Sequence, residues 1–180
     1  MTVSRIFDSV PVRKKFLKAE ATERGYCLDV MTRLALAHPE VRIRALAKGR
    51  ELFHYPATSR LSERIALVLG TADADRLQPI EGGNDRLRVT GFASRPDFTC
   101  ATTRQIYAFV NGRYVKDYLL NHAVMTAYRR VIEPRRYPAA VLYVDLEPAE
   151  VDVNVHPAKL EVRFRQPRTV YEAIVGALSA

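Results

Sequence analysis

The sequence predicts an α+β fold in which helices pack on a sheet. Three observations favour it: apolar and polar residues alternate with a period of two in several short runs, turn-forming dipeptides separate those runs, and apolar residues recur at helical spacing in other segments. Of the 180 residues, 48% are hydrophobic and 27% are charged, which is ordinary globular composition. A chain of this length can bury one good core or two small ones.

The first elements are expected to be a strand that ends at Val10 and a helix that starts at Pro11 and carries a basic run. A longer helix should follow and stop before Pro39, because the residue before a proline is pushed out of helical backbone space. Its apolar residues at helical spacing are Tyr26, Val30, Leu34 and Ala37. Two strands, 41–45 and 51–55, should flank the turn at Lys48-Gly49.

A domain boundary is predicted where the chain changes character, so that residues 1–57 and 58–180 form separate domains. Ser59 is a suitable N-cap for a helix that Gly70 ends. Beyond this helix the pattern is mostly strand, which predicts that the second domain is a sheet with helices packed on it.

Two hairpins are expected in the second domain, because Gly-Gly-Asn-Asp and Asn-Gly are turn signals between alternating runs. A helix should come next and reach Val131, followed by an apolar strand over residues 139–146. The first hairpin joins strands 78–81 and 87–92 through residues 82–85, and the second joins strands 105–110 and 113–115 through Asn111-Gly112.

The clearest pattern lies between residues 151 and 164, where two alternating runs flank a stiff turn. Residues 151–155 are typical of a half-buried strand, which Pro157 must end because proline has no N–H for a ladder. Lys159 follows on a short connection, and the alternation resumes over residues 160–164. A lysine at a strand end is most often solvated, whereas a cation held on a stiff loop suits an anionic ligand.

Three motifs resemble the MutL family of DNA mismatch repair ATPases, and they occur in the family's order. They are Asp-Val-Asn-Val-His-Pro-Ala-Lys at 152–159 with Glu-Val-Arg-Phe at 161–164, the Asn-Gly turn segment 109–117, and segment 7–17. Ser9, Val10 and Val12 depart from the usual residues of the last motif. The resemblance implies the end of a GHKL ATPase domain followed by a transducer-type mixed sheet with packed helices, in a ribosomal-protein-like βαβ topology.

The resemblance also implies a role for Lys159, which in such proteins reaches the γ-phosphate of ATP and acts in catalysis and in cofactor binding. ATP and Mg²⁺ would be bound mainly by an upstream domain, since the glycine-rich lid motifs that cradle phosphates are not in this sequence. The fragment is therefore expected to be inactive alone. Asn154 and His156 either orient the lysine loop by hydrogen bonds or merely line a wet groove.

A surface for DNA is the second implied site, consistent with a net charge of +8. Family members bind DNA with little sequence preference near the helix that follows the Asn-Gly turn, although cations at a helix C-terminus can equally serve its dipole. Tyr118 stands where some members carry a basic residue. The candidate phosphate contacts are Arg113, Lys116, Arg129, Arg130, Arg135 and Arg136.

The remaining expectations concern partners and location. The resemblance implies a mismatch-recognition partner of MutS type and a homodimer formed through regions absent from this sequence. Cys27 and Cys100 lie far apart, without metal-ligand spacing to the histidines, so no metal site is expected. No membrane span or signal peptide is expected, which favours a cytoplasmic protein. Two alternatives stay open: the transducer domain of another GHKL enzyme, such as a type II topoisomerase, and a free-standing basic nucleic-acid-binding protein.

Overall fold

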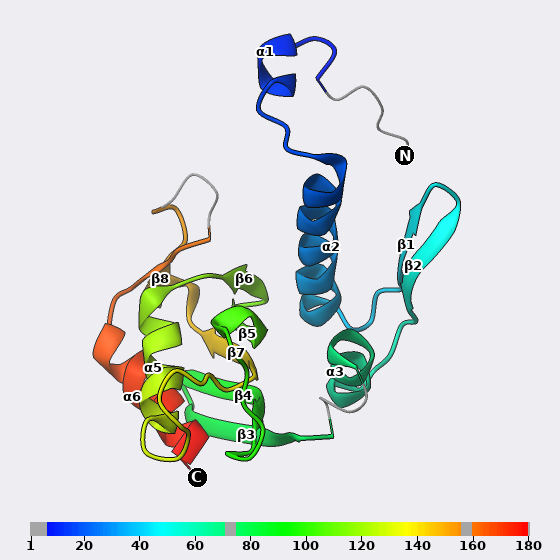
Figure 1. Ribbon diagram of the computed structural model, residues 1–180. Coiled ribbons are helices and arrows are strands. Elements are labelled where there is room, and N and C mark those ends of the chain that lie inside the picture. Colours follow the sequence, from blue (N-terminus) through cyan, green and yellow to red (C-terminus); the bar gives the residue numbers. More distant parts are fainter. Residues whose placement is uncertain (1–6, 71–74, 156–159, 180) are drawn as a thin grey trace.

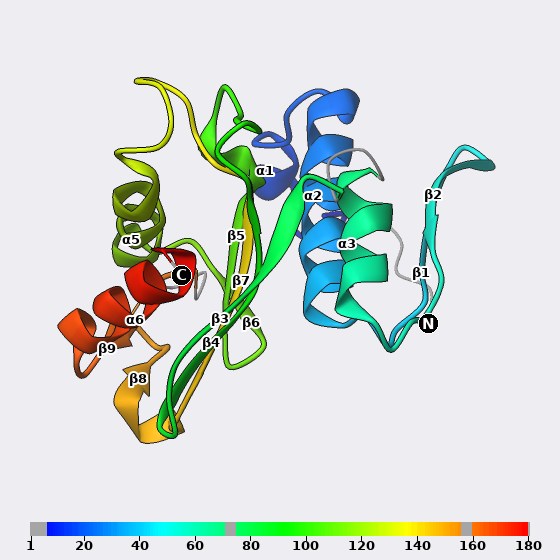
Figure 2. The same ribbon diagram turned by 90° about the horizontal axis from the view of Figure 1, so that it is seen from below.

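A five-stranded mixed sheet lies at the centre of the computed structural model, which describes residues 7–70, 75–155 and 160–179. Helices cover both faces of this sheet, so the predicted α+β class with packed helices is confirmed (Figure 2). The strand order is β3-β4-β7-β5-β6. The strands are β3 Leu77–Asn84, β4 Leu87–Ser94, β5 Ile106–Val110, β6 Arg113–Val115 and β7 Ala140–Leu146, with short 3-10 turns at Thr103–Gln105 and Pro148–Glu150.

The strands β5 and β7 are parallel neighbours, whereas the other pairs in the sheet are antiparallel. Parallel strands need a crossover connection, and helix α5 (Tyr118–Tyr128) lies in it. Asn111 and Gly112 have φ values of 48° and 76°, which are those of the tight turn between β5 and β6 that the sequence predicts. Asp117 caps α5 by accepting hydrogen bonds from the N–H groups of Leu119 and Leu120.

The larger hydrophobic core lies between one face of the sheet and helices α5 and α6 (Pro167–Ser179). Ala108 and Val110 of β5 belong to this core, whereas Phe109 between them belongs to the opposite face. Helix α6 is not among the elements expected from the sequence. Its signals are nonetheless plain, with Pro167 at its start and Val170, Ile174 and Ala177 buried at helical spacing.

The opposite face of the sheet is covered by helices α2 (Glu20–Ala37) and α3 (Leu61–Leu69) (Figure 2). The predicted end of α2 before Pro39 is correct. Leu36 is fully buried against the sheet, whereas Tyr26, Val30 and Leu34 remain about half exposed. The hydroxyl of Tyr143 donates to the carbonyl of Leu36 at 2.7 Å, which satisfies one of the carbonyls that the last turn of a helix leaves free.

A separate hairpin, β1 (Ile43–Ala47) with β2 (Arg50–Tyr55), extends beyond α3, as the sequence predicts (Figure 1). Buried Arg64 of α3 stabilises the base of this hairpin, because its guanidinium donates to three backbone carbonyls at 2.6–2.9 Å. Burial lowers the pKa of Arg64. These carbonyls belong to Pro39, Val41 and Pro56.

Two expectations in the first sixty residues are wrong. Residues 7–9 form a turn where a strand to Val10 was expected, and helix α1 is limited to Pro11–Lys14. Ser59 does not cap α3: the N-cap residue is Arg60, which makes no side-chain capping bond, and its N–H donates to the Thr58 hydroxyl in the preceding loop. The domain boundary after residue 57 stays a prediction.

Two further boundaries are shifted. The β3–β4 loop is Asp85-Arg86, with the Asn84 side chain accepting the N–H groups of Arg86 and Leu87. Gly82 therefore lies within β3, where a Cβ would come within 2.7 Å of the Ala177 side chain on α6. Helix α5 ends at Tyr128, short of Val131. Within the described ranges, no helix combines the length and hydropathy needed to cross a bilayer.

Candidate functional site

Residues 153–162, called the lysine loop because they include Lys159, connect two short strands. These strands, β8 (Val151–Asp152) and β9 (Arg163–Phe164), form an antiparallel ladder. The strands expected over 151–155 and 160–164 thus pair over only 2 residues each. The Asn154 N–H donates to the Asp152 side chain at 2.8 Å, which turns the backbone away from a ladder. Asn154 is exposed, and the contact that fixes it is made by its backbone N–H.

A second bond fixes the returning limb of the loop. The Lys116 N–H donates to the carbonyl of Leu160 at 2.6 Å, so the chain after the loop is joined to the end of edge strand β6. Val162 and Phe164 are then buried in the larger core. Lys159 and His156 lie outside the described residues, but Leu160, the next residue after Lys159, is held by this hydrogen bond from Lys116.

The anchored limb borders a groove of about 490 Å³ between α2 and the β5–β6 turn. Its walls are partly apolar, with Val30 and Leu34 opposite Leu160, and two arginines, Arg33 and Arg113, also line it. Arg33 pairs with Asp29 and lies over the Tyr114 ring at 4.2 Å, which links α2 to β6. Among the groove's described lining residues there is no carboxylate to hold Mg²⁺.

The six candidate DNA cations fall into two sets at opposite ends of α5. Arg113 and Lys116 are exposed on β6 and just after it, before the helix. Arg129 and Arg130 are exposed at its C-terminal end, where the helix-dipole explanation also applies. Helix α5 has 11 residues and is therefore ~16 Å long, so the structure does not gather the two sets at one point.

The loop after α5 carries the other two arginines. Arg135 is exposed and has a positive φ of 66°. Arg136 is partly buried and donates to the side chain and the carbonyl of Thr99, at 2.8 and 2.5 Å, so it also holds this loop to the connection between β4 and β5. A groove of about 520 Å³, here called the basic groove, is lined by Arg129, Arg135 and Arg136 together with His122 and Glu133.

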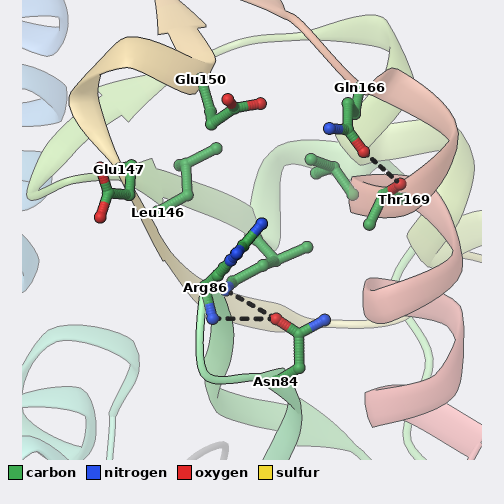
Figure 3. Close-up of a pocket in the computed structure, with 9 residues that line it drawn as sticks. Asn84, Arg86, Leu146, Glu147, Glu150, Gln166 and Thr169 are labelled. Atoms are coloured by element: carbon green, nitrogen blue, oxygen red, sulfur yellow. Dashed lines mark hydrogen bonds between the residues drawn. The ribbon is translucent and has the colours of Figure 1, made fainter.

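Another groove, of about 530 Å³, lies beside the β3–β4 turn and the start of α6 (Figure 3). Arg86 lines it from the turn, Glu147 and Glu150 line it on the other side, and the Thr169 hydroxyl donates to the Gln166 side chain at its rim (Figure 3). Its charges are mixed, and none of the predicted site residues lines it. It is therefore set apart from the candidate site.

The family model described as "DNA mismatch repair protein, C-terminal domain" matches residues 65–180. The chain belongs to this family. It is 87% identical over 179 residues to the DNA mismatch repair protein MutL of Syntrophus aciditrophicus (strain SB), a match that covers 99% of the chain and 29% of that relative. The chain thus spans about three tenths of the length of the curated relatives it matches, as a second at 42% identity from Geobacter sulfurreducens also illustrates. Membership of the mismatch-repair family argues against the transducer domain of another GHKL enzyme, such as a type II topoisomerase.

Solved structures of MutL ATPase domains are similar to the chain. The Aquifex aeolicus MutL ATPase domain complexed with ADP has a TM-score of 0.58 and 30% identity, and the match covers 79% of the chain and 50% of that domain. A second structure of the Aquifex aeolicus ATPase domain has a TM-score of 0.68 at 24% identity and covers 97% of the chain and 59% of that domain, which supports the fold. The chain is thus related to MutL ATPase domains.

Two features of this region are missing from the sequence-based site. The first is His122, which lines the basic groove and stacks on the rings of Tyr118 and Tyr171. The second is helix α6, which carries Tyr171. The helical spacing of Tyr118 and His122 could have suggested that they share a face. Nothing local in the sequence indicates that Tyr171 joins them, because that contact comes from the packing of α6 on α5.

Proposed function

We propose that this chain is the part of a mismatch-repair ATPase that presents Lys159 to the phosphates of ATP and contacts DNA without sequence preference. The hydrogen bond from Lys116 to Leu160 carries the first half of the proposal. It holds the limb that leads out of the loop at the edge of the sheet, beside a groove shared with α2. A loop held at this place can couple the state of a neighbouring nucleotide both to the sheet and to α2.

In this proposal the chain supplies a positive charge, and the upstream part of the longer protein supplies most of the binding of ATP and Mg²⁺. A lysine on a loop fixed at both limbs acts as a point charge that needs little reorganisation when negative charge develops on a phosphoryl group. Asn154 and His156 would help to hold the loop. A MutS-type partner, a homodimer formed through other regions and a cytoplasmic location belong to the same proposal.

The test is ATP turnover by the longer protein carrying Lys159→Ala. Loss of a transition-state charge contact should lower kcat on the order of 10²-fold, while circular dichroism stays unchanged. Lys159→Arg should restore only part of the rate, because a planar guanidinium does not reproduce a point charge. Lys48→Asn, which removes an exposed lysine at the tip of the β1–β2 hairpin, is the matched control and should leave kcat unchanged. A normal kcat in folded Lys159→Ala would show that the lysine is simply solvated.

The DNA half is supported by the exposed cations at both ends of α5. Neutralising about four phosphates of a duplex should give a slope of about −3.6 for log K against log salt concentration. The double substitution Arg129→Glu with Arg130→Glu should weaken binding to all sequences alike. Arg42→Glu with Arg50→Glu, on the β1–β2 hairpin region, makes the same change in charge elsewhere and should have the smaller effect. Salt-independent binding would exclude this half of the proposal.

A further inference from the structure

Three aromatic rings form a continuous stack across α5 and α6. The rings of Tyr118 and His122, one turn apart on α5, have centroids 5.7 Å apart and planes inclined by 11°. His122 in turn stacks on Tyr171 of α6, at 5.5 Å and 27°. These helices pack side by side, so the stack is supported by both of them.

The outer ring of this stack is unusually open. Tyr118 is 82% exposed, the highest value among the large hydrophobic side chains exposed in the described chain. Its contact with His122 occupies one face of the ring and leaves the other available. A ring already held by a neighbour loses little side-chain freedom on binding, so a planar group placed on it gains stacking energy at low entropic cost.

Cations lie before and after the stack along α5. Lys116 is exposed two residues before Tyr118, and His122 shares the basic groove with Arg129. The neighbouring carboxylates are largely occupied: Asp117 accepts backbone N–H groups at the start of α5, and Glu172 pairs with Arg168 at 2.7 Å. Glu133 also lines the groove, but three arginines outnumber it there.

An open ring between two positive regions is suited to a chain that carries both planar groups and negative charges. A single strand of DNA has unstacked bases next to its phosphates, whereas the bases of a duplex already stack on one another. We propose that Tyr118 is a base-stacking platform, on which an unpaired base stacks when a single strand of DNA lies along α5. The inference rests on the proposed DNA binding and adds to it one residue that contacts a base.

The platform predicts a specific loss when the ring is removed. Tyr118→Ala should weaken binding to a labelled oligothymidylate by about tenfold, and Tyr118→Phe should bind within about twofold of the native chain. Binding to a blunt duplex of equal length, and to an abasic strand, should be the same for Tyr118→Ala as for the native chain. His122→Ala should lose part of the oligothymidylate binding, and His122→Phe should retain it because the stack is kept. Fluorescence anisotropy at one fixed salt concentration measures all four variants.

Two controls separate the possible failures. Tyr26→Ala removes a half-exposed tyrosine from α2 and should leave binding of every probe unchanged. The Arg129→Glu and Arg130→Glu pair should weaken binding of every probe, including the abasic strand. If this pair acts and Tyr118→Ala binds oligothymidylate as the native chain does, the platform is excluded and the DNA surface stands. If neither the pair nor Tyr118→Ala changes any affinity, the proposed DNA surface and the platform fail together.

Discussion

The two faces of the central sheet are held by different kinds of interaction. The face under α5 and α6 is a continuous apolar core, with residues such as Leu142, Val124 and Ile174 fully buried. The face under α2 and α3 has a smaller apolar cluster and depends more on directional contacts. These are the bond from Tyr143 to Leu36 and the arginine that α2 places on Tyr114.

We infer from this difference that the face under α5 and α6 is rigid, and we call it the scaffold. The face under α2 and α3, called the joint below, can shift more easily. A close-packed core resists any relative movement, because sliding would open voids and lose many contacts at once. A face with few apolar residues and individual polar contacts can shift at a cost of only a few such contacts. The limb that follows Lys159 lies next to the joint and is bonded to the sheet, which is the arrangement expected of an element that reports on movement there.

The scaffold face should show the largest loss on truncation. Ile174→Ala leaves a cavity where α6 meets the sheet and should lower the free energy of unfolding by about 3 kcal/mol. Urea denaturation followed by circular dichroism measures this. A loss below about 1 kcal/mol would mean that α6 packs loosely and that the two faces are not different in kind.

On the face under α2 and α3, removal of a single polar atom should lower the free energy of unfolding by a smaller amount. Tyr143→Phe keeps the ring but leaves the Leu36 carbonyl without its hydroxyl donor, which should cost about 1–2 kcal/mol in the same denaturation experiment. Thr90→Val on neighbouring strand β4 is a control that also removes a hydroxyl and should have the smaller effect. Equal losses for the two variants would remove the reason to single out this bond.

Alkaline pH should sharpen the same comparison. Burial raises the pKa of Tyr143 on the joint and of Tyr128 on the scaffold face. The folded state therefore holds these protons more tightly, so their stabilising effect is complete below the unfolded pKa of about 10 and is lost as pH rises above it. Urea midpoints should fall above about pH 10. Tyr143→Phe should show a smaller fall, and an identical fall would contradict the assignment to Tyr143.

Local sequence signals were sufficient for much of the fold. The Asn111-Gly112 turn adopts the positive φ values that only such residues accept readily, and β7 is apolar from Ala140 to Val144 because both of its faces are covered there. The strand expected over 151–155 was too long because alternation alone does not show that Asp152 accepts a backbone N–H. Helix α6 was not predicted, although Pro167 and the helical spacing of Val170, Ile174 and Ala177 are signals for it.

The sequence predicts the motif of the candidate site but not the contacts that hold it in place. The sequence points to Lys159 on a stiff connection, and that residue lies outside the described part of the chain. It cannot show that Leu160 meets Lys116 or that Arg136 is bonded to Thr99, because both contacts join segments distant in the chain. Such contacts follow from the packing of the whole sheet.

The most direct test of the joint is amide hydrogen exchange in the longer protein, with and without a non-hydrolysable ATP analogue. The Lys116 amide, bonded to Leu160, should exchange more slowly when nucleotide is bound, whereas amides of β4 and β7 in the scaffold should not change. Lys159→Ala should abolish the slowing at Lys116. Exchange at Lys116 that is unaffected by nucleotide, or that changes equally in the variant, would contradict the claim that this loop links the phosphates to the sheet.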